Sequence, residues 1–143
     1  MGYQTVFGDA FQGKSVLVSG GTSGIGLALA RGFAECGATV VATGSSAARL
    51  DAAAAAHGRK GLSFEQLDVR DINAVEGRIG RFTRLDVLVN CQGVARPDAE
   101  WDEETFLQVM DINLNSAMRL SRAAYPLLKA STGNIVNSRR MPL

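Results

Sequence analysis

The segment that most constrains the fold runs from Lys14 to Gly26, where a short apolar run breaks into glycines and then into a helical pattern. Val16–Val18 are typical of a buried strand, and the residues after Gly24 show helical spacing. Gly20, Gly24 and Gly26 have the spacing G-x-x-x-G-x-G. A sharp turn from strand to helix that lets a ligand approach the backbone favours residues without a Cβ. Because unpaired N–H groups at the start of the helix attract anions, the segment predicts a pyrophosphate site.

The rest of the chain repeats this alternation of strand and helix. Apolar runs predict further strands at residues 37–43, 62–67, 85–90 and 133–137. Helical patterns separate them, including residues 47–56 and a long helix over 102–129 that Pro126 is expected to bend or end. Strands that are each followed by a helix predict an α/β fold with a Rossmann-type, doubly wound parallel sheet of five strands in order 3-2-1-4-5.

Apolar residues outside the strands are expected to close the core. Residues 1–143 are expected to form a single domain, with 1–13 as a lead segment whose Phe7 and Phe11 pack against the first strand. The long helix is expected to turn one stripe inward, made of Phe106, Val109, Met110, Leu114, Ala117, Leu120 and Ala124.

Polar residues fall where the predicted strands end. Ser19 and Gly20 end the first strand, Ser45 follows the second, Asp68 the third, and Asn90 ends the fourth. Ligands of doubly wound sheets bind beyond the carboxyl ends of the strands, at the point where the strand order reverses. These residues are therefore expected to surround one crevice.

The composition argues against several classes of function. Fifteen Lys and Arg residues against fourteen Asp and Glu leave the chain nearly neutral, which indicates neither a nucleic-acid nor a membrane partner. No apolar run approaches the roughly 18 residues that span a bilayer, and the first residues lack a signal-peptide pattern, so a cytoplasmic protein is expected. Cys36 and Cys91 indicate no disulfide framework or metal cluster and are interpreted as buried small residues.

Four motifs together resemble the short-chain dehydrogenase/reductase family over residues 11–137, roughly the first half of such an enzyme. Residues 19–26, Ser-Gly-Gly-Thr-Ser-Gly-Ile-Gly, are similar to the family's T-G-x-x-x-G-I-G, and residues 68–69, Asp-Val, match its adenine-contacting acid. Residues 88–93 resemble its (I/L)-V-N-N-A-G, with Cys91 and Gln92 in place of Asn-Ala. Asn113 falls where the family keeps an asparagine that kinks a helix and holds a proton-relay water.

The resemblance implies the cofactor-binding part of an enzyme that transfers hydride between NADP or NAD and an alcohol or carbonyl substrate. The implied cofactor-binding residues are Ser19, Gly20, Thr22, Ser23, Gly24, Ile25, Gly26, Ser45, Asp68, Val69, Asn90 and Gly93. Asn113 would be the remnant of the proton relay, and Gln92, being larger than alanine, is expected to crowd the cofactor. The alternative interpretations are structural: Asp68 as a turn cap, Asn90 bonded to neighbouring backbone, and Asn113 as a helix kink.

The end of the second strand bears on the choice of cofactor. Gly44, Ser45 and Ser46 stand there without a carboxylate that would repel a 2′-phosphate. Arg49, one turn into the following helix, is a candidate counter-charge. The sequence therefore predicts NADP over NAD.

The family's catalytic residues do not align with this chain. Its mechanism needs a serine and a Tyr-x-x-x-Lys after the fifth strand, in which the cation lowers the pKa of the phenol. Tyr125 and Lys129 have that spacing but precede the strand, so they are expected to lie away from the crevice. The alignment puts Arg140 at the serine, with Ser138 two places early. We therefore expect an inactive, truncated chain that diverges over 138–143, the product of a frameshift or early stop, and that lacks the family's last two strands.

A further expectation follows from this truncation. The fifth strand would be an exposed apolar edge, which favours self-association.

A non-catalytic dinucleotide-binding or interaction module is the alternative function. A methyltransferase on the same sheet is disfavoured, because the gap from Gly20 to Gly24 and the positions of Asp68 and Asn90 fit a dinucleotide better.

Overall fold

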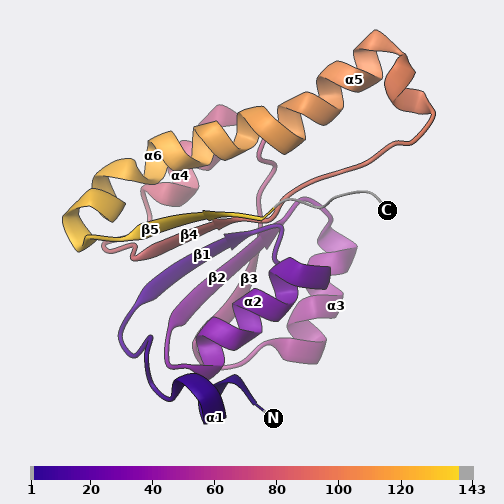
Figure 1. Ribbon diagram of the computed structural model, residues 1–143. Coiled ribbons are helices and arrows are strands. Elements are labelled where there is room, and N and C mark those ends of the chain that lie inside the picture. The colour runs from indigo at the N-terminus through magenta and orange to yellow at the C-terminus, as the bar shows by residue number, and fades with distance from the viewer. Residues whose placement is uncertain (1, 139–143) are drawn as a thin grey trace.

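The computed structural model describes residues 2–138, which form a parallel sheet with helices on both faces (Figure 1). The strands are β1 (Ser15–Ser19), β2 (Thr39–Gly44), β3 (Leu62–Gln66), β4 (Val87–Asn90) and β5 (Asn134–Asn137). The helices are α1 (Tyr3–Phe7), α2 (Gly24–Glu35), α3 (Ala47–His57), α4 (Ile72–Ile79), α5 (Glu103–Met110) and α6 (Ser116–Ser131), with short helices η1 (Ala99–Trp101) and η2 (Asp111–Asn115). The strand order is β3-β2-β1-β4-β5, which confirms the predicted α/β architecture.

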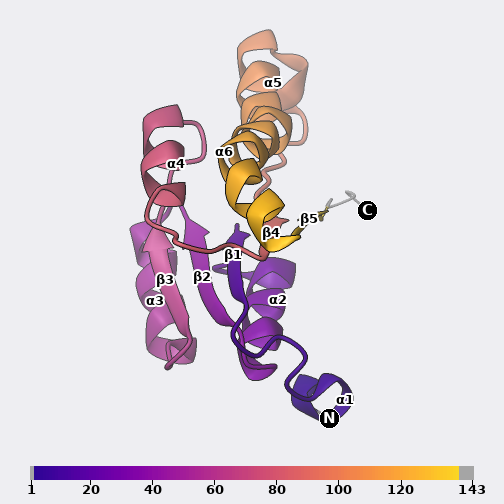
Figure 2. The ribbon, with the colours of Figure 1, turned by 90° about the vertical axis from the view of Figure 1, so that its left-hand side faces the viewer.

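The sheet lies between two helical layers, with α2 and α3 on one face and α4 and α6 on the other (Figures 1 and 2). Successive side chains of β1 alternate between these layers. Leu17 packs in the cluster that includes α4 and α6, whereas Val16 and Val18 pack in the cluster that includes α2. All three are fully buried, which explains why β1 is apolar on both faces.

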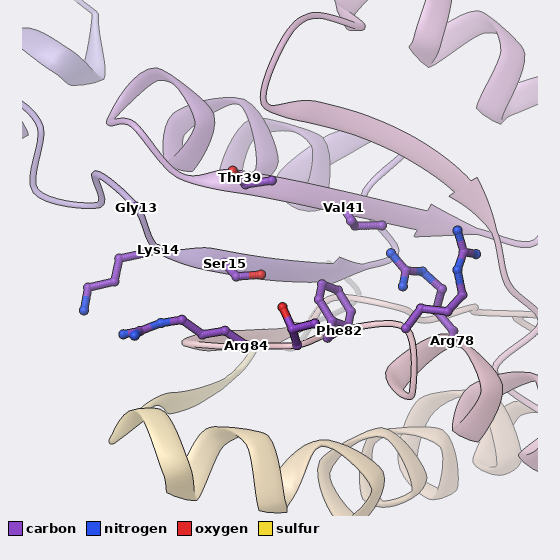
Figure 3. Close-up of a pocket in the computed structure, with 10 residues that line it drawn as sticks. Gly13, Lys14, Ser15, Thr39, Val41, Arg78, Phe82 and Arg84 are labelled. Atoms are coloured by element: carbon purple, nitrogen blue, oxygen red, sulfur yellow. The ribbon is translucent and has the colours of Figure 1, made fainter.

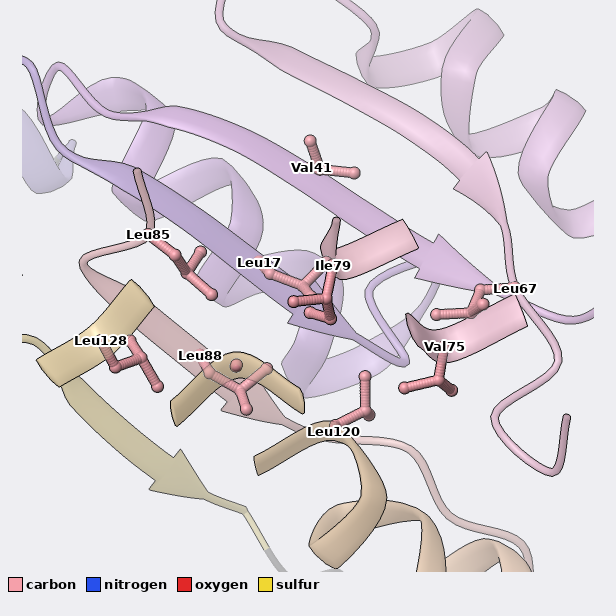
Figure 4. Packing of buried hydrophobic residues seen from close by; sticks show 10 residues of the cluster. Leu17, Val41, Leu67, Val75, Ile79, Leu85, Leu88, Leu120 and Leu128 are labelled. Carbon is pink, nitrogen blue, oxygen red and sulfur yellow. The ribbon is translucent and has the colours of Figure 1, made fainter. Parts of the chain in front are cut away.

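The core on the α4 and α6 side is made mainly of branched aliphatic residues from the sheet and from these two helices (Figure 4). Leu17 and Leu88 come from the sheet, Val75 from α4, and Leu120 and Leu128 from α6. Burying a side chain of this size contributes roughly 1.5–3 kcal/mol. This packing fixes α4 and α6, and therefore the loops that lead into them.

The long helical region runs from Glu103 to Ser131, with the π-helical segment η2 between α5 and α6. Pro126, which is expected to bend or end the helix, lies inside α6, so the second alternative is wrong. Val109, Leu120 and Ala124 of the predicted stripe are buried, but Phe106 and Leu114 are exposed. The reason is that α5 extends past the sheet (Figure 1), and that the wider π turn shifts the register of the stripe at Leu114.

The lead segment contacts the core through one aromatic residue. Phe11 packs edge-on against Phe33 of α2, with 4.8 Å between the ring centroids. Phe7 is 57% exposed because α1 lies beyond the amino edge of the sheet (Figure 2), so its predicted packing on β1 is wrong.

At the other end of the described chain, β5 is an edge strand, and all four of its residues are exposed. Ile135 and Val136 are the apolar residues of that edge. None of the helices within residues 2–138 combines the length and the apolar character that crossing a bilayer requires.

Candidate functional site

The turn after β1 brings three strands and one helix together at the carboxyl edge of the sheet. Gly20 has φ +75°, and a Cβ there would lie 2.6 Å from the backbone nitrogen of Gln92. A Cβ on Gly26 would collide with the carbonyl oxygen of Gly20. The backbone N–H groups of Gly20 and Gly21 both donate to the Thr43 carbonyl, at 2.9 Å. The backbone of the turn is therefore in direct contact with the backbone of β2 and of the loop after β4, which leaves no room for a side chain.

The start of α2 is open where this turn ends. Ser23 is the N-cap residue, but its side chain makes no capping hydrogen bond to the helix. Ser23 is exposed, Ile25 is 60% exposed, and Thr22 is partly buried beside Gly44 of β2. The first turn of this 12-residue helix therefore faces solvent without a side chain to cap it.

Strand register places the other predicted residues along the same edge. Ser19 is paired with Thr43 on one side and with Asn90 on the other. Ser45 is exposed just beyond β2, and its carbonyl accepts a hydrogen bond from the Gln66 side chain at 2.9 Å. The Ser46 hydroxyl caps α3 by accepting from the Arg49 backbone.

Asp68 lies in the loop after β3 and is ion-paired. The Arg70 guanidinium donates to its carboxylate from Nε at 2.9 Å and from Nη2 at 2.7 Å, which holds the pKa of Asp68 below its usual range. The backbone N–H of Arg70 also donates to the same carboxylate, so the turn-cap interpretation of Asp68 describes one of its contacts. The neighbouring Val69 packs on the core, and its carbonyl accepts from Arg119 of α6.

Asn90 is 4% exposed and ties β4 to its neighbours. Its Nδ2 donates to the side chain of Asn137 on β5 at 2.9 Å and to the Ser121 hydroxyl of α6 at 3.3 Å. Its Oδ1 is buried and has no hydrogen-bond partner within the described residues. The side chain thus bonds other side chains rather than neighbouring backbone.

Asn113 lies in η2, where the helical hydrogen bonding changes to a π turn. Its Oδ1 accepts from the Val94 N–H and its Nδ2 donates to the Val94 carbonyl, both at 2.8 Å. Gly93 lies directly beneath, since a Cβ there would be 3.4 Å from Asn113 Oδ1. The helix irregularity and the loop after β4 are therefore joined by one carboxamide.

A second side-chain hydrogen bond joins the same loop to α6, and nothing in the sequence indicated this contact. Gln92 Nε2 donates at 2.8 Å to the hydroxyl of Ser116, which is fully buried and donates in turn to the Ile112 carbonyl. Gln92 Oε1 is buried without a partner among the described residues. Next to it, Cys91 is only partly buried, unlike Cys36, and that burial raises the pKa of its thiol.

The buried carboxylate of Asp86, before β4, is a further feature that sequence reasoning missed. It accepts from Arg84 Nη2 at 2.7 Å and from the Ser15 backbone at 2.9 Å, with Lys14 Nζ at 3.6 Å. The Arg84 hydrogen bonds lower the pKa of Asp86 to about 2. The sequence does offer one sign of a buried, paired carboxylate here, because Asp86 stands between the apolar residues Leu85 and Val87.

Tyr125 and Lys129 lie on α6, which leads into the amino end of β5. The predicted crevice is at the carboxyl ends of the strands, so the structure places this pair towards the other edge of the sheet, as expected. Tyr125 is 59% exposed. Arg140, aligned above with the catalytic serine, lies outside the described residues.

The comparison with known protein families identifies the class. The family described as short chain dehydrogenase matches residues 14–139, and the chain belongs to this family. Within residues 2–138, no group of three or more His, Cys, Asp or Glu side chains is arranged to hold a metal ion.

Individual relatives match this chain over about half of their own length. It is 38% identical over 138 residues to an L-fucose dehydrogenase of Bos taurus, covering 91% of this chain and 50% of that protein. It is 39% identical over 137 residues to a 3beta-hydroxysteroid dehydrogenase of Mediterraneibacter gnavus, covering 89% and 49%.

Solved structures agree with this assignment. The chain matches a short chain dehydrogenase structure from Pseudomonas syringae with a TM-score of 0.79 at 30% identity, over 90% of this chain and 59% of the other. A serine dehydrogenase from Escherichia coli gives a TM-score of 0.75 at 30% identity, over 86% and 60%.

Proposed function

We propose that this chain is the dinucleotide-binding part of an oxidoreductase that transfers hydride between a nicotinamide cofactor and an alcohol or carbonyl compound. The observation that carries the proposal is the glycine turn, in which Gly20 and Gly26 bring the backbone against the start of α2. The nicotinamide ring supplies the hydride chemistry when the cofactor is bound.

The donors of the turn fit a pyrophosphate. The first turn of α2 has no side-chain cap, and Ser23 and Ile25 at its start are exposed. Backbone N–H groups and the positive end of a 12-residue helix bind an anion without a lysine or arginine. In this proposal Gly20, Gly24 and Gly26 border the pyrophosphate.

The remaining predicted residues divide between binding and support. Asp68 and Val69 border the adenine, and Arg70 keeps the Asp68 carboxylate charged as an acceptor. In the same proposal, Asn90 and Gly93 border the adenosine and nicotinamide side of the crevice. Asn113 holds Gly93 and Val94 in place through its two hydrogen bonds.

The preferred cofactor of this proposal is NADP. Ser45 and Arg49 are exposed beyond β2, and no salt bridge involves Arg49 within residues 2–138. Fluorescence titration should therefore give tighter binding of NADPH than of NADH. Arg49→Gln should weaken NADPH binding several-fold, on the order of 1 kcal/mol, and leave NADH unchanged. The matched control is Arg122→Gln, an exposed arginine on α6. Equal wild-type affinity for the two cofactors would overturn the preference.

We further propose that the chain alone does not turn over substrate. Tyr125 and Lys129 have the spacing of the family's catalytic pair, but they lie at the amino edge of the sheet. This observation also favours the second candidate, a non-catalytic dinucleotide-binding module. Incubating the purified chain with NADPH and a panel of ketones and aldehydes tests both, because any turnover removed by mutation in the glycine turn would refute inactivity.

The last part of the proposal is self-association through β5. An edge strand with unpaired backbone groups and exposed Ile135 and Val136 is a template for pairing with a second chain. Light scattering should show a mass that increases with protein concentration. Ile135→Lys should shift the population towards monomer, and a concentration-independent monomer would contradict the proposal.

A further inference from the structure

A basic groove runs along the sheet face that α4 and α6 cover, on the opposite face from the glycine turn and α2 (Figure 3). It has a volume of about 390 Å³ and begins at the amino ends of β1 and β2. Its lining includes four cations, Lys14, Arg78, Arg81 and Arg84, with Phe82 between Arg84 and Arg78. Arg78, Arg81 and Arg84 recur at every third residue through the end of α4 and the loop after it.

The groove has more positive charge than its carboxylates offset. Asp86 pairs with Lys14 and Arg84, and Glu65 pairs with Arg78 and Arg81. Two carboxylates against four cations leave a surplus of two positive charges, whereas the entire chain has a formal net charge of +1. The local surplus therefore exceeds the net charge of the whole chain, and the remaining Lys, Arg, Asp and Glu residues sum to −1.

The arginines keep hydrogen-bond donors for a ligand. Arg84 bonds Asp86 through Nε and Nη2, and Arg81 bonds Glu65 through Nη1 alone. Arg78 is 8% exposed, and its guanidinium lies 4.5 Å from the Phe82 ring centroid. A guanidinium has five N–H donors, so each of these groups can bind an anion while it remains paired.

The apolar part of the lining limits the kind of anion. Phe82 and Val41 both border the groove, and both pack on the core cluster. Hydroxyl side chains of Ser15, Thr39 and Thr83 lie along the rest of it. A groove with cations at both ends and an aromatic ring between them suits a phosphate group attached to a small apolar body.

We propose that this groove is a second binding site, separate from the dinucleotide crevice, for a small phosphate monoester with an apolar body. The phosphate binds at the end formed by Arg78 and Arg81, where two cations face the single carboxylate of Glu65, and Phe82 contacts the apolar part. The site does not depend on the dinucleotide proposal, because no residue of the glycine turn or of the loop after β4 lines it.

The test titrates the chain with phenyl phosphate, following backbone amide resonances by NMR at constant ionic strength. Saturable shifts are expected at Phe82, Thr83 and Arg84, with weaker binding of inorganic phosphate and none of phenol. Arg81→Ala should weaken binding of phenyl phosphate by about fivefold or more, because its side chain is 66% exposed and Arg78 still pairs with Glu65.

Matched variants separate a site from general attraction to positive charge. Arg122→Ala removes an arginine that is 64% exposed, also at the surface but outside the groove, and should leave the affinity unchanged. Lys14→Gln, at the other end of the groove, should weaken binding less than Arg81→Ala does, because Lys14 lies beyond Phe82. Equal losses in the Arg81 and Arg122 variants would overturn the proposal. Displacement of phenyl phosphate by NADH, which carries no phosphate monoester, would also overturn it, because the probe would then occupy the dinucleotide crevice.

Discussion

Replacing Gly20 by alanine should both destabilise the fold and remove dinucleotide binding. The residue has φ +75°, where a non-glycine residue costs about 1–2 kcal/mol. The new Cβ would also lie 2.6 Å from Gln92 N and 2.7 Å from the Cys91 carbonyl carbon, both of which are backbone atoms. Relieving such overpacking typically costs a further 1–3 kcal/mol or so. We expect the free energy of unfolding to fall by about 3 kcal/mol.

Gly77→Ala is the matched control for this substitution. Gly77 lies inside α4, and a Cβ there would meet no atom within 4 Å. Alanine should therefore raise the free energy of unfolding by about 0.5–1 kcal/mol, because it lowers the backbone entropy of the unfolded chain. The two glycine substitutions should therefore change the free energy of unfolding in opposite directions.

Urea unfolding followed by far-UV circular dichroism measures both variants. Trp101 is 93% exposed, so its fluorescence would report the fold poorly. A Gly20→Ala protein as stable as the wild type would refute the close approach of the turn to the loop after β4. Stable Gly20→Ala protein that still bound NADPH would also refute the assignment of the turn to the pyrophosphate.

Three other substitutions test single contacts. Asp86→Asn should lower the free energy of unfolding by about 2 kcal/mol at neutral pH, because the pKa of Asp86 is lowered to about 2 in the folded chain. As the pH falls from about 4 towards 2, the stabilities of wild type and variant in urea unfolding should converge. A difference that stays constant with pH would contradict this. Asn113→Ala should cost about 1 kcal/mol and speed hydrogen exchange at the Val94 amide, whereas unchanged exchange would refute the pairing. Tyr125→Phe should leave stability and any reductase activity unchanged, and a large loss of activity would make Tyr125 catalytic.

The strands could be predicted because each carries its own local signal, and their alternation with helices favoured the observed order. Residues 16–18 and 87–89 are apolar and fully or almost fully buried, and a glycine turn or a capped helix follows the strands. Phe106 and Leu114 could not be placed in this way. A helical stripe assumes a constant number of residues per turn, and the π segment at Asp111–Asn115 changes that number.

The strand ends that carry the proposed site residues could be predicted, but the partners of their side chains could not. Parallel pairing requires Ser19 and Asn90 to meet at one edge, and the register confirms this. Nothing in the local pattern shows that Asn90 bonds Asn137, 47 residues away. Side-chain partners of this kind depend on where α6 and β5 pack, and only the folded chain determines that.

The loop after β4 shows what these distant partners contribute. The backbone of Gln92 lies against Gly20, while its side chain reaches Ser116, 24 residues away, and Asn113 binds Val94 across 19 residues. Both ties end on the helical region at or beside the π segment. A shift of the π segment towards the sheet would therefore move the loop after β4 and the glycine turn together, because the backbones of that loop and of the turn cannot approach each other more closely. The irregular helix is thus a structural support of the proposed dinucleotide crevice, even though it lies on the opposite face of the sheet from α2.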